Sequence, residues 1–172
     1  MFRQMRRGKQ ALSKAQCEEI LQRATCGVLA LLGDGGYPYA VPLSYLYADG
    51  KLYFHCAKEG HKMDALRREP KASFCVVDRD EVIPQEYTTY FRSVIAFGKV
   101  QEVVDETKKG EIIDQLALRY APHDTDKNRS EAIRREWSAL CVLQMTVEQL
   151  SGKEAIELVR RRKEDEREEQ PC

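Results

Sequence analysis

The 172-residue chain is long enough for one domain, and 42% of its residues are hydrophobic, enough for a core. Its 28 basic residues balance its 28 acidic residues, so net charge gives no argument for a nucleic-acid or membrane partner. No apolar run has the length of a membrane span, and the basic N-terminus lacks the apolar stretch of a signal peptide. We therefore expect a cytoplasmic protein. The six cysteines are scattered without a CxxC pair, which argues against a zinc cluster and against a disulfide framework.

The first third of the chain predicts a helix followed by an antiparallel strand meander. Ser13 is a candidate N-cap for a helix over residues 14–24. Short glycine turns then separate three apolar segments, which is the pattern of strands joined by hairpins. These strands are expected over residues 26–32, 37–47 and 51–55, with Pro38 and Pro42 interrupting the second.

The rest of the chain alternates helical and strand patterns without a βαβ repeat. Helical spacing is expected over residues 61–68, 106–120, 129–136 and from 151 to the end, and strands over 71–78, 90–104 and 140–147. Residues 121–128 are expected to form a loop. Six strands with inserted helices favour an α+β fold, mainly β, built on an antiparallel barrel rather than a Rossmann sheet. A glycine-rich dinucleotide fingerprint and a P-loop are both missing from the sequence.

The segment Lys51–Pro70 is the most informative in the chain. A strand ends at His55-Cys56-Ala57, and Gly60-His61-Lys62 then opens a short helix. The free N–H groups and the dipole of a helix N-terminus favour an anion, and Lys62 adds a full positive charge. A phosphate group is the expected ligand.

Three segments, residues 27–47, 52–70 and 90–103, together resemble split β-barrel flavoproteins related to pyridoxamine 5′-phosphate oxidase. Within that group the sequence is most similar to the 5-nitroimidazole resistance (Nim) proteins. The features that carry the resemblance are the Val41-Pro42 pair in the second strand, the strand-to-helix segment around Gly60, and a Ser93-Val94 pair followed by Gly98.

The resemblance implies a six-stranded split barrel over residues 1–155 that binds FMN at a homodimer interface, followed by a charged tail over 156–172. It places an arginine–lysine phosphate clamp at His61 and Lys62, so histidine replaces the arginine, and Arg92 and Ser93 are candidates to complete the clamp. Oxidation of vitamin B6 is not expected. The implied cofactor-binding residues are Val41, Pro42, Leu43, His55, Cys56, Ala57, Gly60, His61, Lys62, Arg92 and Ser93.

His55 is the candidate catalytic residue, because the neutral-range pKa of histidine suits proton delivery during flavin-dependent reduction. The alternative is a hydrogen bond from His55 to the ribityl chain or phosphate. Cys56 is either a redox-active thiol or a small packing residue, and Trp137 either stacks near the flavin of the partner or packs a helix on the barrel. No metal site is expected.

The expected function is an FMN-dependent oxidoreductase that takes electrons from NADH or NADPH. The expected acceptor is a small molecule, such as a nitro-aromatic compound. The alternative is a flavin- or haem-binding carrier or sensor without turnover. The basic run Arg160–Lys163 is followed mainly by acidic residues, so no nucleic-acid partner is expected.

Overall fold

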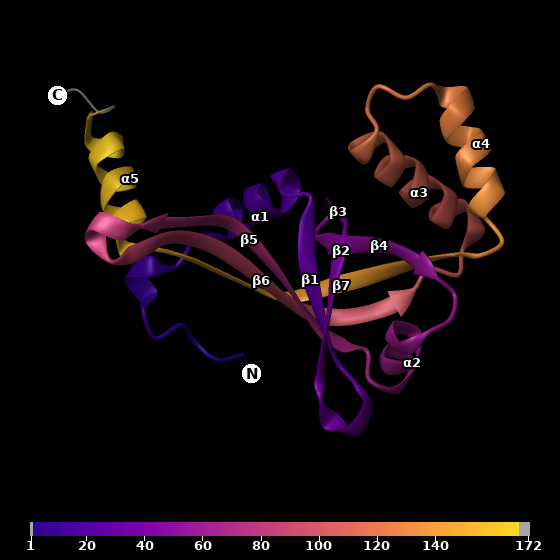
Figure 1. Ribbon diagram of the computed structural model, residues 1–172, viewed down its shortest axis with the longest axis horizontal. Helices are drawn as coiled ribbons and strands as arrows, with labels where there is room; N and C mark the ends of the chain where they lie inside the picture. Colours follow the sequence, from indigo (N-terminus) through magenta and orange to yellow (C-terminus); the bar gives the residue numbers. More distant parts are fainter. Residues whose placement is uncertain (1, 169–172) are drawn as a thin grey trace.

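The computed structural model describes residues 2–168, and within that range seven strands form one antiparallel sheet (Figure 1). The order across the sheet is β2-β1-β5-β6-β7-β4-β3. The strands are β1 (Cys26–Leu32), β2 (Pro38–Ser44), β3 (Leu46–Ala48), β4 (Lys51–Ala57), β5 (Lys71–Ile83), β6 (Thr88–Glu102) and β7 (Leu140–Glu154). The α+β class is confirmed.

The strand count differs from six because the expected strand over 37–47 divides at Tyr45. Its first part, β2, pairs with β1, and its second part, β3, pairs with β4 at the opposite end of the sheet order. Tyr45 is fully buried: its hydroxyl donates to the Leu21 carbonyl at 2.8 Å, and its N–H donates to the Tyr120 hydroxyl at 2.9 Å. Tertiary contacts therefore set the break, which lies three residues after Pro42.

Five α-helices flank the sheet in the described range: α1 (Lys14–Arg23), α2 (His61–Arg68), α3 (Glu106–Tyr120), α4 (Asp126–Glu136) and α5 (Ile156–Glu168). The expected Ser13 cap is confirmed as a reciprocal capping box with Gln16, which stabilises the start of α1. Helix α4 begins three residues earlier than expected, because Thr125 caps it through the Asn128 N–H. Of the expected C-terminal tail, residues 169–172 lie outside the described range.

Strands β5 and β6 extend beyond the barrel as a long hairpin, a feature the sequence does not reveal. Strand β5 continues to Ile83, five residues past the expected end at Asp78, through the polar stretch that follows it. Figure 1 shows this hairpin and α5 at one end of the molecule, and α3 and α4 at the opposite end. Tyr90, Ala155 and Leu158 form a small buried cluster between the hairpin and α5.

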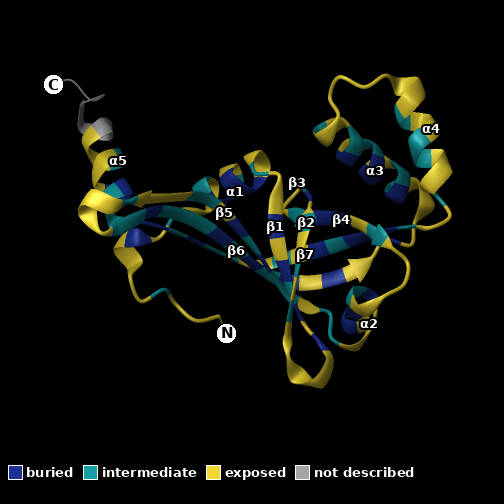
Figure 2. Cartoon of the chain, viewed as in Figure 1, coloured by how far each residue is buried: buried dark blue, intermediate teal, exposed yellow. Residues whose placement is uncertain are grey.

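The main core lies between the sheet and helices α1 and α2. Leu21, Leu29, Phe54 and Phe74 are fully buried in it, and a second cluster packs α3 against Tyr53 and Val142. Figure 2 shows the contrast with α4, in which no residue is buried. Among the described helices, none combines the length and the hydropathy needed to cross a membrane.

Candidate functional site

The end of β4 and the start of α2 bring six of the predicted site residues together. His55, Cys56 and Ala57 end the strand, and His61 is the first residue of α2, as the sequence predicts. Gly60 is the N-cap with φ of 116°, a backbone conformation that side-chain-bearing residues rarely adopt. Because glycine has no side chain to cap the helix, the first N–H groups of α2 are left for an external acceptor.

Lys62 differs from the other cations of α2 in its charge environment. Arg67 pairs with Asp64 at 3.2 Å, and Arg68 pairs with Asp34 at 2.7 Å. Over the described range, Lys62 forms no ion pair with a carboxylate; its positive charge instead acts on His55 and Cys56. A partly buried cation without a counter-ion, beside uncapped helix N–H groups, is suited to an anionic ligand.

His55 is exposed at the end of β4. Partial burial, and then the charge of Lys62, lower its pKa below the ordinary value of 6.5. Without an anionic ligand, His55 is therefore mostly neutral at pH 7. A neutral imidazole both donates and accepts a hydrogen bond, so His55 can orient a ligand as well as exchange a proton.

His61 is directed at the turn between β1 and β2 rather than toward Lys62. Its ring stacks on Tyr39 with centroids 4.0 Å apart, and its Nε2 lies 3.5 Å from Asp34. Asp34 also pairs with Arg68, which holds the pKa of that carboxyl below its usual value. These contacts join α2 to the β1–β2 turn. Asp34 and Tyr39 belong to the site region but carry no sequence signal for it, since their role depends on tertiary contact.

Val41, Pro42 and Leu43 lie on β2, which is the edge strand at one end of the sheet order and pairs only with β1. Leu43 packs against the main core, and Pro42 is exposed. A strand edge leaves one side of its backbone N–H and C=O groups open for a ligand, and proline is tolerated there because it has no N–H. The stacking of Tyr39 on His61 ties this strand to α2.

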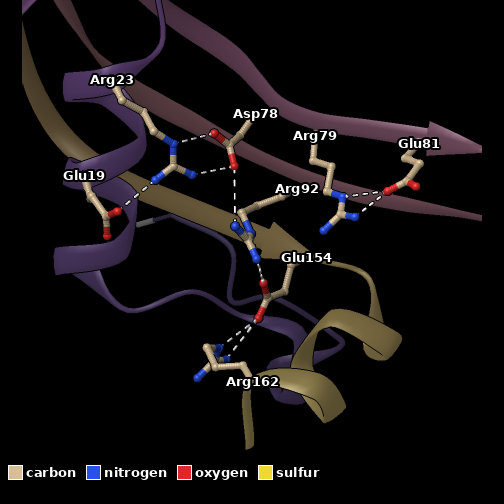
Figure 3. A network of polar contacts seen from close by, with 8 residues as sticks. All are labelled: Glu19, Arg23, Asp78, Arg79, Glu81, Arg92, Glu154 and Arg162. Carbon is tan, nitrogen blue, oxygen red and sulfur yellow. Dashed lines mark hydrogen bonds and ion pairs between the residues drawn. The ribbon is translucent and has the colours of Figure 1, made fainter. Parts of the chain in front are cut away.

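Arg92 and Ser93 do not join this cluster within one chain. On β7, Glu154 is the partner of Arg92 and Val142 is the partner of His55. Arg92 and His55 are therefore twelve positions of β7 apart, which is about 40 Å along the strand. Arg92 is held by Glu154 at 3.0 Å and by Asp78 at 3.6 Å (Figure 3). Ser93 alternates with the inward-facing Val94 and so lies on the outer face of the sheet.

Figure 3 shows that this network extends further, to Arg23 on α1 and to Arg162 on α5. Glu154 is fully buried, and Arg162 contacts it at 3.0 Å from the side opposite Arg92. Asp78 and Glu154 each have two arginine partners. The arrangement connects three strands and two helices, which indicates a structural role for Arg92 in the chain.

Trp137 packs between helices α3 and α4. Its Nε1 donates to Glu106 at 2.9 Å, and the ammonium of Lys109 lies 4.1 Å from the ring centroid. Of the two alternatives for this residue, the contacts within the chain are those of helix packing.

The comparisons with known proteins bear on the family and the fold of the chain. The family model described as pyridoxamine 5′-phosphate oxidase matches residues 13–154. No curated protein matches the chain. Among solved structures, a candidate 5-nitroimidazole antibiotic resistance protein from Bacteroides thetaiotaomicron is 25% identical with a TM-score of 0.68, covering 83% of this chain and 85% of that one.

Two further structures share the fold. A FAD-binding protein from Mesorhizobium loti is 26% identical with a TM-score of 0.60, covering 84% of this chain and 96% of that one. A FAD and heme binding protein from Mycobacterium smegmatis is 24% identical with a TM-score of 0.69, covering 86% and 73%. The family match covers well over half of the chain, so the protein belongs to the pyridoxamine 5′-phosphate oxidase family.

Proposed function

We propose that the protein is an FMN-binding oxidoreductase that passes electrons from NADH or NADPH to a small acceptor. The observation that carries the proposal is Lys62, a cation without a carboxylate partner in the described range, on the first turn of a helix whose N-cap is glycine. A phosphate monoester carries a charge near −2 at neutral pH, which matches this site. The likeness to a flavin-binding structure at 26% identity supports a flavin as the carrier of that phosphate.

The residues around Lys62 fit the remaining parts of a flavin mononucleotide. The terminal phosphate would bind the first N–H groups of α2 and the Lys62 ammonium. The open edge of β2, over Val41–Leu43, offers backbone groups to the polar edge of an isoalloxazine ring. When bound, the flavin supplies transfer of one or two electrons, and the protein supplies binding, orientation and protons.

His55 is the residue we assign to proton exchange. In the free protein its lowered pKa keeps it neutral at pH 7, so it is a poor acid there. A bound phosphate offsets the charge of Lys62, which removes one of the two causes of the lowered pKa. Flavin binding would therefore raise the pKa of His55 and make it a better proton donor. The likeness to the Bacteroides protein suggests a nitro-aromatic acceptor.

We also propose a homodimer, with its interface on the outer face of the sheet. The outward positions of β1, β2, β5 and β6 are mostly apolar or small, and paired positions continue the surface across all four strands. Val28, Leu32 and Val77 are 36%, 51% and 62% exposed on this face. The apolar or small outward residues include Val28, Ala30, Leu32, Ala40, Pro42, Ser73, Cys75, Val77, Ser93, Ile95 and Phe97.

A continuous apolar face of this kind is typical of a protein–protein contact. Ser93 belongs to this face and is far from Lys62 within one chain. In the proposed dimer, the partner subunit would bring polar groups of its own face toward Lys62. Replacing Val28 with glutamate should convert a dimer into a monomer, as measured by light scattering after gel filtration. Val104→Glu is the matched control, because Val104 is 83% exposed and lies outside this face. A Val28→Glu protein that stays dimeric would exclude this interface.

The function is tested on the protein as purified. The expected visible spectrum has the two absorption bands of an oxidised flavin, and the flavin released on denaturation should co-elute with FMN. With NADH or NADPH, the holo-protein should reduce a nitroimidazole faster than the same concentration of free FMN. A Soret band would replace the proposal with a haem protein, and turnover equal to that of free FMN would reduce it to a flavin carrier.

A further inference from the structure

Cys56 and Cys141 face each other across two neighbouring strands. Cys56 lies on β4 and Cys141 on β7, and the antiparallel register makes them direct partners. Directly opposite residues on antiparallel strands have Cα atoms about 4.5–5.5 Å apart, within the range that a disulfide spans. The two residues are 85 positions apart in the sequence, which is why no cysteine motif announces the pair.

The two thiols share one environment inside the barrel. Cys141 is 1% exposed in the main core, and Cys56 packs against the same core. The antiparallel register places the two side chains directly opposite each other on one face of the sheet. Each thiol also shifts the pKa of the other. The Sδ atom of Met63 lies 3.8 Å from the Sγ of Cys56.

The remaining cysteines with described positions have no such partner. Cys26 pairs with Ser44, and Cys75 lies opposite Val28 and Ile95. Cys17 is buried on α1, where it packs against Gly152. Among cysteines in residues 2–168, Cys56 and Cys141 therefore form the one pair placed opposite each other on adjacent strands.

We propose that Cys56 and Cys141 form a reversible disulfide when the protein meets hydrogen peroxide. The Cys56 sulfur attacks one peroxide oxygen, the O–O bond breaks, and one water leaves as Cys56 becomes a sulfenic acid. The Cys141 sulfur then attacks the Cys56 sulfur, the S–O bond breaks, and a second water leaves. In sum, two thiols and one peroxide give one disulfide and two waters, with two electrons passing to the peroxide.

The surroundings assign the first step to Cys56. Burial raises the pKa of both thiols, and the pKa of Cys141 reaches about 12. Lys62 acts in the opposite direction on Cys56, by its charge and by a hydrogen bond, and so favours the thiolate there. Cys56 is also the more exposed of the two. Burial should make the reaction slow compared with that of an exposed, low-pKa thiol.

Peptide mapping of the wild-type protein tests the proposal without any variant. After peroxide treatment, alkylation of the remaining thiols and digestion with trypsin, peptides 52–58 and 136–153 should appear joined, lighter by two hydrogen atoms than their sum. Dithiothreitol should separate them. The linked pair should form in the monomeric band of a non-reducing gel, which places the bond within one chain.

Two variants sharpen this test. Cys141→Ala should leave Cys56 without a partner, so that peroxide converts it to sulfinic acid instead of a disulfide. Cys75→Ser should leave the linked peptide unchanged, because Cys75 lies on the outer face of the sheet. Recovery of Cys56 in wild-type protein as a free thiol, as a sulfinic acid or in a disulfide with a different cysteine would overturn the proposal.

Discussion

Two groups of positive charge in this chain look alike in the sequence and differ in the structure. At the start of α2, Lys62 has no carboxylate partner in the described range and lies beside uncapped N–H groups. At the far end of β7, Arg92 is enclosed by Glu154 and Asp78, and further arginines join the same carboxylates. The first cation is available to a ligand, whereas the second is used by the fold. A positive charge alone does not indicate a binding site. A positive charge without a carboxylate partner does.

Substitutions in the enclosed network and substitution of Lys62 should have opposite effects on stability and on ligand binding. Removing a member of the enclosed network should cost folding free energy, because a buried charge is left without its partner. Removing Lys62 should leave folding nearly unchanged and affect the bound anion.

The largest effect is expected for Glu154→Gln. The carboxylate is fully buried between Arg92 and Arg162, so its loss should lower the free energy of unfolding by about 3 kcal/mol, at the low end for buried pairs because both arginines are partly exposed. Urea unfolding measures the change. Glu148→Gln is the matched control on the same strand: Glu148 is 42% exposed, and its replacement should change stability by less than about 0.5 kcal/mol. Equal effects of the two substitutions would exclude the structural role of the network.

A smaller effect is expected for Ser13→Ala. This change removes the capping box of α1, the helix that carries Arg23 into the network, and should cost about 1 kcal/mol of unfolding free energy. Thr125→Ala removes the corresponding cap of α4, a helix without a buried residue, and should cost less in the same urea experiment. A larger loss from the Thr125 variant would contradict the account of which helix supports the barrel.

The pH response of His55 distinguishes the free site from the loaded one. Its pKa lies below 6.5 in the free protein, so between that pKa and 6.5 the unfolded chain binds more protons. His55 therefore lowers stability as the pH falls below 6.5, and this contribution should disappear in His55→Gln.

Addition of FMN should raise the His55 pKa measured by NMR. The Lys62→Ala protein should start from a higher pKa and respond less to FMN; an equal response in both proteins would exclude the coupling.

The smallest change in stability is expected for Lys62→Ala. Since the ammonium has no carboxylate partner in the described structure, its removal should change the free energy of unfolding of the apo-protein by less than about 0.5 kcal/mol. Thermal unfolding of apo-protein checks this. A loss as large as that of Glu154→Gln would place Lys62 with the structural charges.

Local signals in the sequence predict much of this fold. The helix over 61–68 and the helix over 106–120 have the expected bounds, and Ser13 caps α1 as expected. Local signals do not predict the polar end of β5, because its strand state depends on pairing with β6. Local signals do not predict the break at Tyr45 either, since contacts with Tyr120 and Leu21 set it.

The candidate site divides in the same way. The strand-to-helix segment around Gly60 and Lys62 is local, and the structure keeps its residues together. The partners of Arg92, the stacking of His61 on Tyr39 and the position of Cys141 opposite Cys56 depend on register and packing. Sequence spacing cannot supply those relations, because each joins residues from separate elements.

The most direct test of the central claim compares FMN with riboflavin, which lacks the phosphate. Wild-type apo-protein should bind FMN more tightly than riboflavin, and Lys62→Ala should lose about tenfold or more in FMN affinity while its riboflavin affinity stays the same. Lys58→Ala, an exposed lysine in the loop before α2, should behave like wild type. A Lys62→Ala protein that keeps the full preference for FMN would contradict phosphate binding at Lys62, as would equal weakening of FMN and riboflavin binding by both substitutions.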